Sequence, residues 1–307
     1  MADAGIVDGP GPSAGRRTLG VRRRLTPYYL LTPGGFYLTI FFLLPLVLMI
    51  YTSLQSGGVL SGGFTFTWEF QNYSDVVGAY QPQFLRSVAY SLIVTFAALL
   101  LAYPMTYWIA FYAGRWKSSF LLLILLPFFV SFVIRTVQWK FILGDNGPVL
   151  GLLKGIGILP EDFRVLATPL AVVAGITYNF LPFTALPLYV SLERIDKRMI
   201  EAAKDLYSTR WQAFLKVVWP LSLPGVFAAF LLTFVPATGD YVNSQLLGGP
   251  STTMIGQIIQ TKFLTENDYP EAAALSVVLM VAMVILASIY ARVLGTEEAT
   301  RGAAAAA

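Results

Sequence analysis

The sequence predicts an all-α membrane protein with six transmembrane helices. Of its 307 residues, 56% are hydrophobic and only 12% are charged, whereas a soluble domain carries about 25% charged residues. Six separate stretches are apolar over the roughly 20 residues that a helix needs to cross a bilayer. The chain has no Cys and no His, which removes disulfides, the usual zinc ligands and the commonest general base. We therefore expect a membrane protein without a metal site.

Taken in order, the spans lie between two tails. The first 33 residues are rich in Gly, Pro and Arg and predict a disordered cytosolic tail, 1–33. The membrane domain, 34–294, holds predicted spans at 34–54, 85–111, 119–141, 168–191, 220–246 and 271–294. Residues 295–307 form a C-terminal tail. Proline falls inside several spans, which lipid-embedded helices tolerate because neighbouring helices can donate to the carbonyls that proline leaves free.

Basic residues set the orientation. Of the 21 Lys and Arg residues, only six fall on the side opposite the N-terminus: Arg86, Arg135, Lys140, Lys154, Arg164 and Lys262. Basic residues concentrate on the cytosolic side of a membrane protein. Both termini and the segment 193–218 are therefore expected in the cytosol. The outer loops 55–84, 142–167 and 247–270 are long enough to serve as packing or docking surfaces.

The segment 193–218 is polar, although it lies between two apolar spans. Its first half, "ERIDKRMIEAAKDL", repeats Ile195, Met199, Ala203 and Leu206 at helical spacing. Thr209 with Gln212 three residues later is a capping box that begins a second helix, which is expected to end at Pro220. An amphipathic loop lying on lipid headgroups would show such a pattern. A helix pair that docks in a protein groove explains the mixed charge better.

This segment resembles the EAA motif of bacterial ABC importer permeases. The matching residues and the apolar residues of the second helix are Glu201, Ala202, Ala203, Asp205, Leu206, Trp211, Phe214 and Pro220. In that family the element couples the permease to its ATPase. Tyr207 departs from the pattern, because the family has Gly there. A bulky residue in a left-handed turn is strained by roughly 1 kcal/mol or more.

The resemblance covers most of the chain and implies a type I importer permease fold. Passages such as "FVPATGDYVNSQLLGGPSTTMIG" are similar to the spermidine/putrescine branch. The implied partners are an ABC ATPase (a dimer), a second and different permease, an extracytoplasmic solute-binding protein and membrane lipid, with no nucleic acid. No Walker A sequence is present, so ATP and Mg would bind to the partner ATPase and this chain would hold no cofactor. The implied location is the bacterial inner membrane.

A path for a polyamine needs acceptors and an anionic group. Asp240, near the outer end of the fifth span, is the leading candidate, because a carboxylate within a span is costly unless it has a function. Alternatively, it is solvated or pairs with Arg135 or Lys140. Further polar candidates are Tyr241, Asn243, Gln138, Trp139, Tyr178 and Asn179. Trp139 and Tyr178 equally suit an interfacial belt, and Gln138 and Asn179 equally suit helix pairing.

Two other classes fit less well. A secondary transporter usually shows internal repeats with buried acidic relays, but this chain has one isolated acid and a cytosolic coupling motif. A membrane enzyme would have few reactive groups available. A permease for another small organic solute or ion remains an alternative within the same family.

Overall fold

The computed structural model describes residues 31–59 and 62–305, so almost all of the predicted N-terminal tail lies outside the described part of the chain. The chain divides into two units, Met1–Thr52 and Ser53–Ala307. In the described residues, five helices are long and apolar enough to cross a membrane, and a bent pair, Gly114–Phe129 with Phe132–Ile142, makes a sixth span if it counts as one.

In the first unit, the described residues are helical throughout. The helix Leu31–Ser53 coincides with the first predicted span. It includes a π-helical turn, η1 (Thr39–Leu43), followed by α2 (Leu44–Ser53). Pro45 has no N–H to donate to the carbonyl one turn earlier, and a wider turn just before the proline relieves that mismatch.

The second unit begins with a short antiparallel hairpin and a very long helix. Strands β1 (Gln55–Gly58) and β2 (Gly63–Phe66) pair with Gln55 opposite Phe66. Helix α3 runs over Gln71–Tyr112, 42 residues, or about 63 Å at 1.5 Å per residue, twice the hydrocarbon thickness. The predicted loop 55–84 is therefore wrong for residues 71–84, which are helical. Only one stripe of this segment is apolar, and it packs against α12 and α13 through Val76, Ile255 and Leu275.

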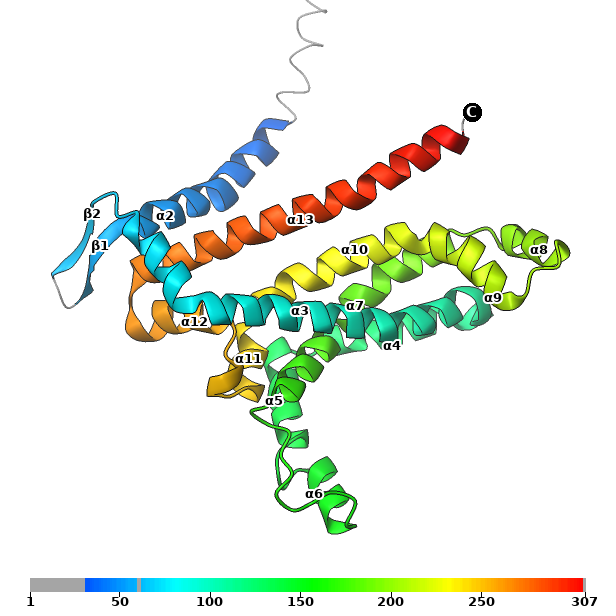
Figure 1. Ribbon diagram of the computed structural model, residues 1–307, viewed down its shortest axis with the longest axis horizontal. Helices are drawn as coiled ribbons and strands as arrows, with labels where there is room; N and C mark the ends of the chain where they lie inside the picture. The colour runs from blue at the N-terminus through cyan, green and yellow to red at the C-terminus, as the bar shows by residue number, and fades with distance from the viewer. Residues whose placement is uncertain (1–30, 60–61, 306–307) are drawn as a thin grey trace, which may run out of the picture. The chain divides into compact units, whose positions relative to one another are not determined.

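The core of the membrane domain is formed by three helices that pack side by side (Figure 1): α3, α7 (Pro169–Glu193) and α10 (Trp219–Thr238). Small residues allow the close approach, with Ala102, Ala185 and Ala229 fully buried between them. Hydroxyl groups form hydrogen bonds between the helices. The Oγ1 atoms of Thr184 and Thr233 lie 2.7 Å apart, and the Thr238 hydroxyl donates to that of Ser91 at 2.8 Å.

The third predicted span, 119–141, is not one straight helix. It consists of the 3-10 turn η3 (Gly114–Trp116), α4 (Lys117–Leu125), the 3-10 turn η4 (Leu126–Phe129) and α5 (Phe132–Ile142). The helices bend by 90° at the break. Pro127 removes one helical donor, and Val130 then adopts an extended backbone with ψ 137°. The bend directs α5 against α7 and α11 (Figure 1).

The remaining elements complete the outer loops and the C-terminus. They are α6 (Pro148–Gly155), α11 (Tyr241–Leu247), the 3-10 turn η6 (Pro250–Thr252), α12 (Ile255–Thr261), the π turn η7 (Lys262–Glu266) and α13 (Tyr269–Ala305). The predicted fifth span, 220–246, is interrupted at Gly239 and Asp240, where α10 ends and α11 begins. The predicted C-terminal tail continues α13 as far as Ala305, since its Ala and Glu residues favour helix.

Candidate functional site

The polar segment after α7 folds as two short helices. Helix α8 covers Lys197–Asp205, and α9 covers Arg210–Ala213. Asp196 caps α8, since its side chain accepts from the backbone N–H of Arg198 at 2.9 Å. Thr209 and Gln212 form the predicted capping box, which is confirmed by reciprocal bonds of 3.2 and 2.9 Å. The helix–turn–helix is therefore specified locally, by side chains at both N-termini.

The turn between the two helices contains the residue that departs from the family pattern. Tyr207 has φ 60°, which is left-handed backbone, where Gly is at ease and other residues are strained. Its side chain is 97% exposed. Among the described residues, the Tyr207 ring makes no hydrogen bond and no ring contact. This position therefore needs positive φ, although the residue does not favour it.

Phe214 connects this element to the membrane domain. It belongs to a π-helical turn, η5 (Phe214–Val218). The Phe214 ring contacts Tyr103 at 5.8 Å and Tyr107 at 5.7 Å, both on α3, and stacks on Trp211 at 5.4 Å. Around it, Ile195 and Val218 are buried together with Ala110 and Leu192. Packed side chains therefore connect the segment of α8 and α9 to α3 and α7.

The sequence predicted that the second helix ends at Pro220, and this prediction is wrong. Residues Arg210–Thr238 form one continuous 29-residue helix that is long and apolar enough to cross a membrane. The π turn precedes Pro220 by one residue and accommodates its missing N–H. Helix α9 is thus the end of the same rod that crosses the membrane as α10.

The outer face of the element is exposed in the isolated chain. Glu201, Ala202, Asp205, Leu206, Tyr207 and Trp211 are exposed, and Ala203 is half-buried. The predicted apolar stripe is divided, because Ile195 packs inward whereas Met199 and Leu206 face outward. Three large apolar side chains at the tip, Leu206, Tyr207 and Trp211, form a surface that a protein groove could cover.

A second polar site lies where α10 gives way to α11. Asp240 is 6% exposed and caps α11. Its two carboxylate oxygens accept from the backbone N–H of Asn243 at 3.0 Å and from its amide at 2.6 Å. The salt bridge to Arg135 or Lys140 that the sequence left open is not formed in the described part of the chain. Asp240 is buried instead of solvated.

This carboxylate begins a network across three helices. Asn179 on α7 donates to Asn243 and to Thr136 on α5, both at 3.1 Å. Asp240, Asn243 and Asn179, three of the predicted path residues, are thus brought together. The Oδ1 atom of Asn179 is buried without a partner in the described residues. A buried acceptor without a donor indicates a polar site that is incomplete in the isolated chain.

The other path candidates lie apart from this network. Trp139 and Tyr178 contact each other edge to face at 5.3 Å, whereas Gln138 and Tyr241 are exposed. The sequence reasoning missed Thr136, and also Ser87, which accepts from the N–H of Ile255 at 2.7 Å. A signal was available in α3, where Ser87, Ser91 and Thr95 recur every four residues on one helix face.

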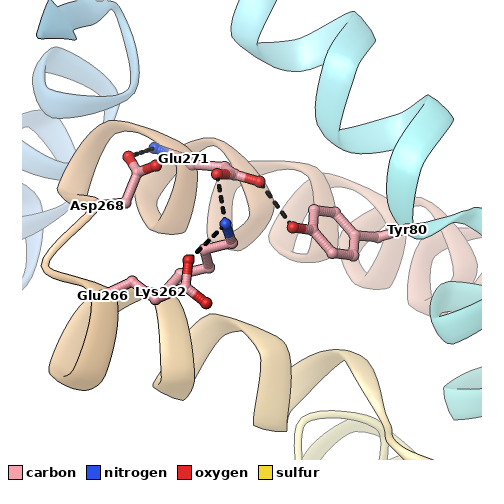
Figure 2. A network of polar contacts seen from close by, with 5 residues as sticks. All are labelled: Tyr80, Lys262, Glu266, Asp268 and Glu271. Atoms are coloured by element: carbon pink, nitrogen blue, oxygen red, sulfur yellow. Dashed lines mark hydrogen bonds and ion pairs between the residues drawn. The ribbon is translucent and has the colours of Figure 1, made fainter.

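A charged cluster joins α3, η7 and α13 (Figure 2). Lys262 pairs with Glu266 at 2.7 Å and with Glu271 at 2.9 Å, and Tyr80 donates to Glu271 at 2.9 Å. Burial alone would lower the pKa of Lys262, but its hydrogen bonds to the two glutamates raise that pKa above the ordinary value. Burial raises the pKa of Asp268, a side-chain hydrogen bond with Glu271 adds to this shift, and the hydrogen bond from the backbone N–H of Glu271 opposes it. The cluster holds the loop before α13 against α3.

The helix–turn–helix of α8 and α9 and the bent third span can now be compared with known proteins. The family described as binding-protein-dependent transport system inner membrane component matches residues 24–296. This chain belongs to that family.

Relatives and structures agree with the assignment. The chain is 34% identical over 258 residues to the spermidine/putrescine transport system permease protein PotB of Haemophilus influenzae, covering 83% of this chain and 90% of the relative. It is 33% identical over 257 residues to PotB of Escherichia coli, covering 83% and 93%. A crystal structure of a bacterial ABC transporter for import of the acidic polysaccharide alginate matches with TM-score 0.66 at 19% identity, covering 91% of this chain and 99% of that one.

Family membership makes this chain a multi-pass permease subunit of an ABC importer. The fold is that of a type I importer permease. At 19% identity the alginate transporter supports the fold alone.

Proposed function

We propose that this permease moves polyamines of the spermidine/putrescine class into the cell, driven by a separate ATPase. The observation that carries the coupling part is the packing of Phe214 against α3 and α7. This packing fixes the exposed helix–turn–helix at the end of the long helix that continues as α10. The polyamine part is supported by the PotB relatives, which match over most of their length.

In this proposal, α8 and α9 face the cytosol together with both termini. The exposed tip, Leu206, Tyr207 and Trp211, docks on one subunit of a dimeric ABC ATPase, which binds ATP and Mg. Closure of the ATPase displaces the tip, and Phe214 transmits the displacement to Tyr103 and Tyr107. A second, different permease completes the path, and lipid surrounds the pair.

The opposite side would receive a solute-binding protein. The hairpin β1–β2, the first turns of α3 and the start of α13 surround a cavity bordered by Asp75, Asp268 and Glu271. Three carboxylates at this end suit a docked protein or an arriving organic cation. A bacterial alginate ABC transporter of similar fold, 19% identical to this chain, has been crystallised in complex with its periplasmic protein.

The network around Asp240 supports a path for cations only indirectly. Both of its oxygens already accept from Asn243, so Asp240 stabilises the break between α10 and α11 whether or not it meets the solute. Other small organic solutes remain the alternative class. An ion-coupled secondary transporter is disfavoured, because the exposed coupling element would then have no purpose.

The deciding experiment is ATP hydrolysis by the reconstituted complex of both permeases, ATPase and binding protein. Putrescine, spermidine, an amino acid, a sugar and phosphate are added one at a time. We expect stimulation by the two polyamines alone. Stimulation by a different solute would keep the permease assignment and reject the polyamine class. If ATP hydrolysis does not depend on this chain under any condition, the proposed coupling to an ATPase is rejected.

A further inference from the structure

Just after the bend in the third span, an arginine has two buried donor atoms with no hydrogen-bond partner in the described part of the chain. This residue, Arg135, lies at the end of the first turn of α5 and is 7% exposed. Its Nε and Nη1 atoms are buried with no acceptor among the described residues. A guanidinium in a membrane domain normally pairs with a carboxylate or with carbonyl groups. Arg135 is therefore a buried charged side chain whose Nε and Nη1 donors have no acceptor among the described residues.

Two aromatic rings flank this guanidinium. Its Cζ atom lies 5.9 Å from the ring centre of Phe128 and 5.8 Å from that of Phe132. The Phe128 ring contacts Phe183 at 4.9 Å, Phe183 contacts Phe180 at 5.6 Å, and Phe180 contacts Phe132 at 6.3 Å. These four phenylalanines, from η4, α5 and α7, are linked in a row by ring contacts, and we call them the phenylalanine cage.

A cage of aromatic faces attracts cations, because each ring is negative above its plane. Arg135 gains two such contacts but gives up the hydration of its buried nitrogens. Its departure from the cage would break no hydrogen bond at Nε or Nη1 and would restore their hydration. The present occupant is thus weakly held.

The cage lies next to the polar network. Thr136, which follows Arg135, accepts from Asn179, and Asn179 precedes Phe180 of the cage. The unpartnered Oδ1 atom of Asn179 is an acceptor that an N–H donor would satisfy. Phe128 and Phe183 are each 38% exposed in the isolated chain, so the cage is not sealed on that side.

We propose that the phenylalanine cage binds an ammonium group of the transported organic cation, and that Arg135 holds the place of that cation until it arrives. This inference rests on the proposed function, since it takes the transported solute to be cationic. It explains why a cation path contains a buried arginine. Arg135 competes with the solute for the aromatic faces, and the arriving ammonium group displaces it.

The first test is the concentration of putrescine that half-saturates ATP hydrolysis by the reconstituted complex. Phe132→Leu keeps most of the volume but removes one aromatic face. We expect it to raise that concentration about two- to tenfold. Phe141→Leu is the matched control on the same helix, outside the cage, and should leave it unchanged. Arg135→Gln removes the competing cation and should lower the concentration.

Opposite results overturn the proposal. If Phe132→Leu behaves like Phe141→Leu, the rings do not bind the solute. If Arg135→Gln raises the half-saturating concentration or separates the two permeases during purification, Arg135 pairs with a carboxylate of the partner permease in the assembled complex and is no placeholder.

A second measurement does not depend on which solute is transported. In the Arg135→Ala complex the cage loses its cation, so methylguanidinium should raise the melting temperature whereas neutral methylurea should not. In the wild-type complex the two compounds should act alike. If polyamines fail to stimulate the wild-type complex but methylguanidinium stabilises Arg135→Ala, the proposed solute is wrong and the cage stands. Equal effects of both compounds on Arg135→Ala reject the cage.

Discussion

Replacing Tyr207 by Gly should make the coupling element more stable. The backbone at Tyr207 has φ 60°, a conformation that costs a non-glycine residue about 1–2 kcal/mol. Glycine removes that cost but adds about 0.5–1 kcal/mol of conformational entropy to the unfolded chain. The ring is 97% exposed, so no packing is lost. The net gain lies between about 0 and 1.5 kcal/mol, with a central value of about 0.7 kcal/mol.

The assay is thermal unfolding of the purified permease, followed by tryptophan fluorescence. A gain of this size corresponds to a rise of about 1–3 °C in melting temperature. Tyr207→Ala is the matched control, because it keeps the strained backbone and also lacks the ring, and it should melt close to wild type. If Tyr207→Gly is no more stable than Tyr207→Ala, the left-handed turn is not strained and the reasoning is refuted.

Three further variants test the packing described above, each by melting temperature. Phe214→Ala removes the ring that joins α9 to α3 and should destabilise by about 2–3 kcal/mol, with loss of solute-stimulated ATP hydrolysis; full stimulation would show that force travels elsewhere. Asp240→Asn places an amide opposite the amide of Asn243, and two donors cannot pair, so we expect a loss of about 1–3 kcal/mol; wild-type stability would contradict the network. Lys262→Met leaves Glu266 and Glu271 without their cation and should cost about 1 kcal/mol. Because the pKa of Lys262 is raised, its contribution is fully present below the ordinary lysine value of about 10.4 and is lost only as pH rises beyond it, so the deficit should be equal at about pH 6 and about pH 9.

Some features of this permease follow from local sequence. The capping box of Thr209 and Gln212 involves residues three apart, and its two hydrogen bonds form as predicted. The turn at Tyr207 is left-handed where the family motif has Gly. Such features depend on residues that are close in the sequence, so they can be predicted from the sequence alone.

Other features depend on contacts between distant segments. The first turns of α3 look polar in sequence, yet they are helical because one stripe meets α12 and α13. Asp240 could have been solvated or paired with a basic residue. Instead it meets Asn243, which Asn179 and Thr136 hold from two other helices.

The sequence by itself determined that the chain is a helical membrane protein with an EAA-like helix–turn–helix, because hydropathy, capping and that motif each depend on residues within a few turns of helix. Only the tertiary structure decided the 90° bend after Pro127 and the cage beside Arg135. The rings of that cage come from positions 128, 132, 180 and 183, and no local pattern states that η4, α5 and α7 bring these rings together beside one guanidinium.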